Sequence, residues 1–212
     1  MTIGSVTWFG DRAVMVGLAD AAMRSVVVAG LAESLPQCDV RAGMASVLVA
    51  SGEPDPALLA VVERAVAAID PGRVAPRSSS AHVTIPVDYT GADLDEVATM
   101  LRCSVDALVT AHQEQAWSVA MMGFAAGFGY LVPHGRAVLD WSLVARRDRP
   151  REQVPAGSVA LAAGMSAVYP EAMPGGWHLL GHTPLRMFDA QDSSSPSLLR
   201  PSDVVHFTGV QP

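Results

Sequence analysis

The sequence predicts an α+β protein, with a small two-layer α+β domain at residues 1–77 and a β-barrel or β-sandwich domain at residues 81–212. The first 70 residues alternate strand and helix patterns, whereas the chain after Trp117 consists of short apolar runs cut by Gly and Pro. Between them lies a polar stretch, residues 73–81, with three consecutive serines, which is typical of a domain boundary. A chain of 212 residues is long enough for two small domains.

The apolar periodicity of the first 70 residues predicts the element order ββαββα. Asp20 and Asp55 stand where helix caps are expected, and Pro56 suits a first helical turn. The predicted elements are strands at residues 3–9, 13–18, around 40 and 46–50, and helices at residues 20–35 and 57–69.

The second domain is predicted to begin with a strand at residues 83–87. Pro86 confines this strand to a sheet edge or a bulge, because proline lacks an N–H group. Asp93 and Glu96 have the spacing of a capping box for a helix over residues 94–101. Ser104 is expected to cap a second short helix, which carries His112 near its C-terminal end.

The composition excludes several classes of function. The chain carries a formal charge of −7, and a strongly acidic chain is a poor match for nucleic acid. It contains no Lys, which excludes a Walker-A lysine, a Schiff base and a Ser–Lys amidase centre. It contains no Asn, which excludes N-linked glycosylation.

The cysteines and the apolar segments predict a cytoplasmic protein without a membrane partner. Cys38 and Cys103 are far apart and surrounded by apolar residues, so we expect both to be reduced and mostly buried. Two uncharged windows, residues 115–133 and 153–170, are long enough to imitate a membrane span. Both are interrupted by Gly or Pro, which favours strands and turns instead.

Histidine supplies the first candidate site residues. His112 falls on the apolar face of its predicted helix, so it is either a packed core residue or a site residue next to the glycine-rich segment that follows. His178 and His182 have HxxxH spacing, but the nearby Gly and Pro residues favour a strand. Residues four apart on a strand lie roughly 13 Å from each other, too far for one ion, so we predict no metal site.

The remaining reactive side chains give weaker signals. No serine has the surroundings of a nucleophile elbow, and the acidic residues are not paired by spacing. One local cationic run, residues 146–151, contains four arginines. It is either a solvated loop or a grip on a phosphate or carboxylate.

Glycine clusters are the strongest anomaly. Residues 123–131, GFAAGFGYL, contain three glycines and three aromatic residues, and PGGW at 174–177 and GHTP at 181–184 lie close together in the sequence. Glycine permits positive φ and lets a backbone approach a ligand or another strand closely. The clusters are therefore either tight barrel corners or the walls of a binding site.

These clusters and other motifs occur in a recognisable order. The motifs are IPV (85–87), GFAAGFGYL (123–131), VPAGSV (154–159), YP (169–170), PGGW (174–177), GHTP (181–184) and LRMFD (185–189). Over nearly its whole length the chain resembles the B-type subunit of bacterial 5-oxoprolinase. That family is also labelled allophanate hydrolase subunit 1 and includes the Kip-type inhibitor of a sporulation histidine kinase.

The sequence departs from the family pattern inside the glycine-rich loops. Ala126 and Gly129 replace two prolines, and His182 replaces the arginine of the family's GRTP motif. Residues 165–167 replace a Gln-Thr-Gly triplet, and Ser202 replaces a glycine near the end of the chain.

The resemblance implies that the second domain is a cyclophilin-like β-barrel. It also implies a second subunit of related fold, which completes a composite cleft for a small-molecule substrate, and a requirement for ATP with magnesium. We expect His112 and His182 to be catalytic and the glycine-rich loops to bind substrate or nucleotide. The expected binding residues are Gly123, Phe124, Gly127, Phe128, Tyr130, Tyr169, Gly175, Gly176, Trp177 and Thr183.

The predicted function is therefore that of the B-type subunit of a heteromeric 5-oxoprolinase, which converts 5-oxoproline to glutamate with ATP and is inactive alone. Two alternatives stay open: a regulatory protein that inhibits a sensor histidine kinase, and subunit 1 of an allophanate hydrolase. The second fits less well, because amidase-type hydrolysis of allophanate uses a Ser–Lys centre that this chain lacks.

Overall fold

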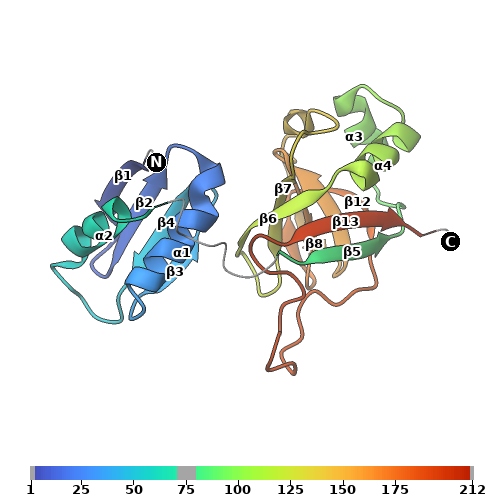
Figure 1. The fold of residues 1–212 in the computed structure, drawn as a ribbon. Coiled ribbons are helices and arrows are strands. Elements are labelled where there is room, and N and C mark those ends of the chain that lie inside the picture. The colour runs from blue at the N-terminus through green and yellow to red at the C-terminus, as the bar shows by residue number, and fades with distance from the viewer. Residues whose placement is uncertain (1–2, 71–79, 211–212) are drawn as a thin grey trace. The chain divides into compact units, whose positions relative to one another are not determined.

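The computed structural model describes residues 3–70 and 80–210, which belong to two compact units, Met1–Ser79 and Ser80–Pro212 (Figure 1). The polar stretch proposed as a boundary, residues 73–81, lies mostly outside the described residues. The assignment of domains to residues 1–77 and 81–212 stays a prediction.

The first unit is a four-stranded sheet with two helices on it. Its antiparallel strands lie in the order β1-β2-β4-β3, and helices α1 (Arg24–Ser34) and α2 (Leu58–Ala67) pack against the sheet and against each other (Figure 1). The chain order is the predicted ββαββα. The strands are β1 (Ile3–Trp8), β2 (Ala13–Leu18), β3 (Asp39–Ala42) and β4 (Ser46–Ala50).

The core of the first unit follows the alternation of its strands. Val14 and Val16 on β2, and Val47 and Val49 on β4, are fully buried beneath the helices. The Asp20 carboxylate accepts the Ala22 amide at 2.9 Å, but this cap belongs to a short 3-10 turn, η1 (Ala21–Met23), that precedes α1.

The second unit contains a seven-stranded sheet that is nearly closed into a barrel. The strand order is β12-β9-β10-β7-β6-β13-β5, with β5 parallel to β13 and the other pairs antiparallel. The bounds are β5 (His82–Val87), β6 (Trp117–Met122), β7 (Gly129–Pro133), β9 (Ser158–Ala162), β10 (Met165–Val168), β12 (His178–His182) and β13 (Val204–Gly209).

Two residues bring the edges of this sheet together. Asp88 follows edge strand β5 and exchanges two backbone hydrogen bonds with His182 at the end of β12, at 2.8 and 2.9 Å. A Cβ atom on Gly181 would lie 2.3 Å from the Asp88 carbonyl oxygen, so only glycine permits this approach. The edge position predicted for the strand with Pro86 is confirmed, whereas the likeness to cyclophilin stays a prediction.

Smaller elements surround the barrel. Helices α3 (Leu94–Leu101) and α4 (Val105–Glu114) contact each other, and α4 packs on β13 (Figure 1). Ser104 caps α4 as predicted, because its hydroxyl accepts the Ala107 amide. The remaining elements are a two-stranded ribbon of β8 (Arg151–Val154) and β11 (Met173–Gly175), and the 3-10 turn η2 (Trp141–Leu143).

The capping box predicted at Asp93 and Glu96 is wrong. The Asp93 side chain makes no bond to the first turn of α3. Its buried carboxylate instead accepts hydrogen bonds from two guanidinium groups and from an amide of β12, all distant in sequence. A buried carboxylate is stabilised more by cationic donors than by a helix terminus.

Two further expectations concern the cysteines and the membrane. Cys38 and Cys103 are free thiols, half-buried rather than mostly buried. Within residues 3–70 and 80–210, no helix has both the length and the apolar character needed to cross a bilayer.

Candidate functional site

A pocket of about 270 Å³ opens on the second unit beside the glycine-rich segments, and we call it the aromatic pocket. Its walls come from the loop between β6 and β7, from β7, from the segment after β10, from β11 and from the segment between β11 and β12. A further stretch, just before β8, supplies its charged rim. The lining residues are Phe124, Phe128, Tyr130, Arg146, Pro150, Tyr169, Pro174, Gly175, Gly176 and Trp177.

Phe128 lies at the centre of the aromatic wall. Its ring is only 2% exposed and meets four other rings edge to face, with centroid distances of 5.0 to 6.0 Å. Such contacts hold aromatic rings in fixed orientations and stabilise each pair by about 0.5–1.5 kcal/mol beyond the area they bury. The wall is therefore formed before any ligand arrives. The four partners are Phe124, Tyr130, Tyr169 and Trp177.

Phe124 is held in a conformation that its residue type disfavours. Its φ is +73° and its side chain is 66% exposed, although it is a large apolar residue. A left-handed backbone costs a bulky residue of order 1–3 kcal/mol, and such strain is concentrated at functional sites. The strain presents an exposed ring at the mouth of the aromatic pocket.

Gly175 gives Tyr169 its place in the pocket. A Cβ atom at position 175 would lie 2.2 Å from the Tyr169 hydroxyl oxygen, so any side chain would displace the ring. Burial raises the pKa of Tyr169, while the Trp177 amide and the positive charges of Arg146 and Arg151 act in the opposite direction. Tyr169 is thus neutral at physiological pH, with its hydroxyl near two guanidinium groups.

A network centred on Asp93 fastens the rim of the pocket. The Asp93 carboxylate is 4% exposed and accepts hydrogen bonds from Arg147 (3.0 Å), Arg151 (2.7 Å) and the Leu179 amide (2.7 Å). Desolvation alone would raise the pKa of Asp93, but the bonds from Arg151 and Leu179 and the charges of both arginines hold it below its usual range. Arg147 also donates its backbone N–H to the carbonyl of pocket residue Gly176 at 2.8 Å.

The same network includes a group of possible metal ligands. Asp93, Glu96 and His178 each offer one ligand atom, and these atoms lie within 4.8 Å of one another. Both carboxylates are already paired with arginine: Glu96 accepts from Arg147 at 2.9 Å, and Asp93 accepts from Arg147 and Arg151. A divalent cation placed here would meet two positive charges, so the residues do not suit a metal ion.

His112 lies in the barrel core instead of in the aromatic pocket. It is fully buried among Trp117, Trp141 and Phe207, with ring centroids at 4.5 to 6.1 Å. Its Nδ1 lies 2.8 Å from the Tyr89 hydroxyl and its Nε2 lies 3.0 Å from the Ser166 hydroxyl. Burial lowers the pKa of His112 to about 3, so the imidazole is neutral and both nitrogens are satisfied.

The other predicted residues divide between the aromatic pocket and the neighbouring loops. Seven of the binding residues line the pocket: Phe124, Phe128, Tyr130, Tyr169, Gly175, Gly176 and Trp177. His182 is exposed, with Nε2 donating to the Ala156 carbonyl at 3.1 Å, whereas Thr183 is buried. Gly127 packs against the backbone of Met187, and Gly123 lies at the start of the loop, outside the lining. The catalytic roles of His112 and His182 stay predictions.

Three lining residues were not among those predicted: Arg146, Pro150 and Pro174. The sequence signal for the first two is the arginine run at 146–151, which was compatible with either a solvated loop or an anion-binding site. The signal for Pro174 is the PGGW motif, of which it is the first residue.

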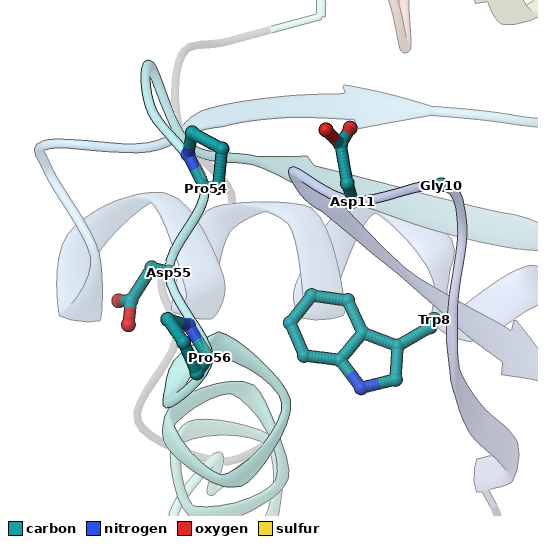
Figure 2. A pocket seen from close by; sticks show the side chains of 6 residues that line it. All are labelled: Trp8, Gly10, Asp11, Pro54, Asp55 and Pro56. Carbon is teal, nitrogen blue, oxygen red and sulfur yellow. The ribbon is translucent and has the colours of Figure 1, made fainter.

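A second hollow, of about 250 Å³, lies on the first unit. Figure 2 shows the Trp8 indole below Asp11, with Pro54 and Pro56 across the hollow. The Asp55 carboxylate accepts the Ala57 amide at 2.8 Å, and Asp11 lies 3.7 Å from Arg12, so both acidic groups have local partners. None of the residues predicted for the site lines this hollow.

Comparison with known proteins places this geometry in a family. The family described as carboxyltransferase domain, subdomain C and D, matches residues 5–199. The B-type 5-oxoprolinase subunit of Bacillus subtilis (strain 168) is 39% identical over 131 residues, which cover 60% of this chain and 52% of that protein. The B-type 5-oxoprolinase subunit of Escherichia coli O157:H7 is 36% identical over 190 residues, which cover 88% of this chain and 81% of that protein.

The fold of this chain is also similar to that of a solved structure. A crystal structure of TTHA0988 superposes with a TM-score of 0.75 at 29% identity, over 95% of this chain and 40% of the other. The chain thus spans about half the length of the Bacillus relative and less than half of TTHA0988. The match over residues 5–199, together with these relatives, confirms the resemblance inferred from the motifs: the chain belongs to the carboxyltransferase family of subdomains C and D and is similar to the B-type subunit of 5-oxoprolinase.

Proposed function

We propose that this chain is the B-type subunit of a heteromeric ATP-dependent 5-oxoprolinase, and that the aromatic pocket is its share of the substrate site. One observation carries the proposal: the pocket is lined by the motifs on which the resemblance depends, GFAAGFGYL, PGGW and the YP tyrosine. The relatives that are named as subunits of 5-oxoprolinase give the substrate. Their subunit name implies a complex, so we expect a second subunit to complete the cleft.

The chemistry requires activation of an unreactive amide. Hydrolysis of 5-oxoproline opens a lactam. Transfer of the terminal phosphoryl group of ATP to the lactam oxygen, with release of ADP, would make the carbonyl carbon reactive toward water. Loss of phosphate and cleavage of the ring C–N bond would then give the carboxylate and the amine of glutamate. That transfer needs positive charge or hydrogen-bond donors at the phosphates. Without lysine, the permanent side-chain positive charge of this chain comes from its arginines, so magnesium and the partner subunit would supply the rest.

The aromatic pocket itself suits the small substrate better than the nucleotide. Its volume of about 270 Å³ is below the roughly 300–1,000 Å³ of pockets for drug-sized ligands. It has one cationic lining residue, against the several charges of a triphosphate. We therefore assign the ring of 5-oxoproline to this pocket and the phosphates of ATP to surfaces outside it.

The test is reconstitution of the complex. The purified chain is combined with the other subunits of the expected complex, and ATP-dependent release of glutamate from 5-oxoproline is measured. We expect release only when all components are present, and no release under any combination would refute the proposal. Release of ammonia from allophanate, or slower autophosphorylation of a sensor kinase, would favour one of the two alternatives.

A matched pair of variants tests the assignment of the pocket. Tyr130→Ala removes a half-buried ring of the aromatic pocket, and we expect kcat/KM of the complex to fall at least about tenfold. Trp8→Ala removes the ring of the other hollow and should leave kcat/KM unchanged within about twofold. The reverse result would move the site to the first unit.

A further inference from the structure

Among the described residues that line the aromatic pocket, Arg146 carries the only formal charge. The others are aromatic residues, prolines and glycines, which offer surface to a ring but do not neutralise an anion. An arginine beside such a wall provides planar, bidentate recognition of a carboxylate.

Arg146 differs from the other three arginines of its run, because two of them are paired with carboxylates and Arg149 lies outside the pocket lining. Arg147 is paired with Asp93 and Glu96, and Arg151 is paired with Asp93. Within the described parts of the chain, the Arg146 guanidinium has no acidic partner. Arg146 is exposed at the rim of the apolar cavity, so its positive charge is accessible to an anionic group.

Asp93 determines where that cation lies. Its carboxylate binds the side chains of Arg147 and Arg151, and Arg147 follows Arg146 directly. The backbone of this segment is attached to the pocket wall, because Arg147 donates to the Gly176 carbonyl and Arg151 is opposite Gly175 in the β8–β11 ribbon. The segment that presents Arg146 is thus fixed on both sides, by its backbone and by the buried carboxylate.

We propose that Arg146 binds the carboxylate of a small cyclic amide whose ring lies against the aromatic wall, and that Asp93 is the positioning residue that holds Arg146 over the pocket. The identity of the ligand as 5-oxoproline rests on the proposed function. The recognition of a ring with a carboxylate by Arg146 rests on the pocket alone.

Calorimetric titration of the full chain, alone and in its complex, separates the two parts of the ligand. The probes are L-5-oxoproline and 2-pyrrolidinone, which share the lactam ring and differ by the carboxylate. We expect 5-oxoproline to bind at least about tenfold more tightly, and Arg146→Gln to abolish that ratio. Arg149→Gln, an exposed arginine of the same run outside the pocket lining, is the matched control and should keep the ratio.

The role of Asp93 is tested by a double-mutant cycle. Asp93→Asn should weaken binding of 5-oxoproline about tenfold and leave the affinity for 2-pyrrolidinone unchanged. The reason is that the aromatic wall stays in place, whereas the Arg146 guanidinium is no longer held over the pocket. In the Arg146→Gln background, Asp93→Asn should have no further effect. If Asp93→Asn does not fold, Arg147→Gln removes one arm of the same network and should give the same pattern more weakly.

Several outcomes would overturn the proposal: equal affinity for the two probes, no binding of either, equal losses in Arg149→Gln and Arg146→Gln, or parallel losses of both probes in Asp93→Asn. The proposed function fails separately. Carboxylate-selective binding without glutamate release would support the role of Arg146 and refute the oxoprolinase function. Glutamate release together with unchanged binding of 5-oxoproline by Arg146→Gln would support the oxoprolinase function and refute the role of Arg146.

Discussion

The core around His112 and the aromatic pocket are built from similar side chains, but only the aromatic pocket leaves a cavity and a charge without an acidic partner. Around His112, four aromatic rings pack on an imidazole whose two nitrogens both have hydroxyl partners, and the imidazole itself is fully buried. In the aromatic pocket, five rings leave a cavity, Phe124 is 66% exposed and Arg146 has no acidic partner among the described residues. A buried polar group with all its bonds made stabilises a fold, whereas an unpaired charge beside a cavity is available to a ligand.

The elements that carry the two regions explain the difference. His112 lies on α4, which packs on β13, so its side chain enters a core made by regular elements. The aromatic pocket is made by loops and strand ends, where Gly175 and the strained Phe124 replace regular packing.

The largest effect is expected from the core. His112→Ala removes a fully buried ring and leaves the hydroxyls of Tyr89 and Ser166 without their partner. We expect the free energy of unfolding to fall by about 3–5 kcal/mol, measured by urea denaturation. Ser166→Ala, which removes one bond and little volume, should cost about 1–3 kcal/mol and remain measurable if His112→Ala does not fold.

A loss of less than about 1 kcal/mol in His112→Ala would contradict the closed core. A folded His112→Ala variant of full stability that loses glutamate release would assign the imidazole to catalysis.

The next effect is a dependence of stability on pH. The pKa of His112 is lowered by burial from its ordinary 6.5 to about 3 in the folded protein. Below pH 6.5 the unfolded chain therefore binds a proton that the folded protein does not, and stability falls as the pH decreases toward 3. The contribution is fully present above pH 6.5, and its loss between pH 8 and pH 5 should be about 2 kcal/mol.

Variants isolate this contribution from that of other titrating groups. His112→Gln should lack this part of the slope in urea denaturation across pH 5–8, although it is less stable throughout. His134→Gln, which replaces an exposed histidine, is the matched control. If the free energy of unfolding has the same slope against pH in the wild type and in His112→Gln, the His112 imidazole is in contact with water in the folded protein.

Local patterns in the sequence predict much of the fold and part of the site. Alternation and helical stripes predict the order of the first unit, and Ser104 and Pro86 act as their residue types predict. The clustered glycine and aromatic residues indicate seven of the ten pocket residues, because close approach of backbone and ring is a property of those residue types.

What could not be predicted depends on partners distant in the chain. Asp93 and Glu96 have capping-box spacing, but the partners of Asp93 lie 54, 58 and 86 residues away. Arg146 could be distinguished from its neighbours only after Arg147 and Arg151 were seen to be paired and Arg149 to lie outside the pocket lining. The two interpretations of His112 differ in whether strands far from it in sequence close around it, which helical periodicity does not determine.

The smallest effect on stability, with a large effect on binding, is expected at Phe124. Phe124→Gly stabilises the fold by relieving the strained left-handed backbone. It destabilises the fold by removing the ring contact with Phe128 and by adding backbone entropy to the unfolded chain. These effects oppose each other, so the free energy of unfolding should stay within about 1 kcal/mol of the wild type. Its affinity for 5-oxoproline should fall at least about tenfold, since the exposed ring at the pocket mouth is gone. Arg102→Gly is the matched control, because Arg102 is exposed and has φ +56° directly after α3. Its free energy of unfolding should be unchanged or higher, and its affinity for 5-oxoproline should be unchanged. If both variants bind 5-oxoproline as the wild type does, the strain at Phe124 is unrelated to the aromatic pocket, and the contrast with the closed core around His112 loses its strongest support.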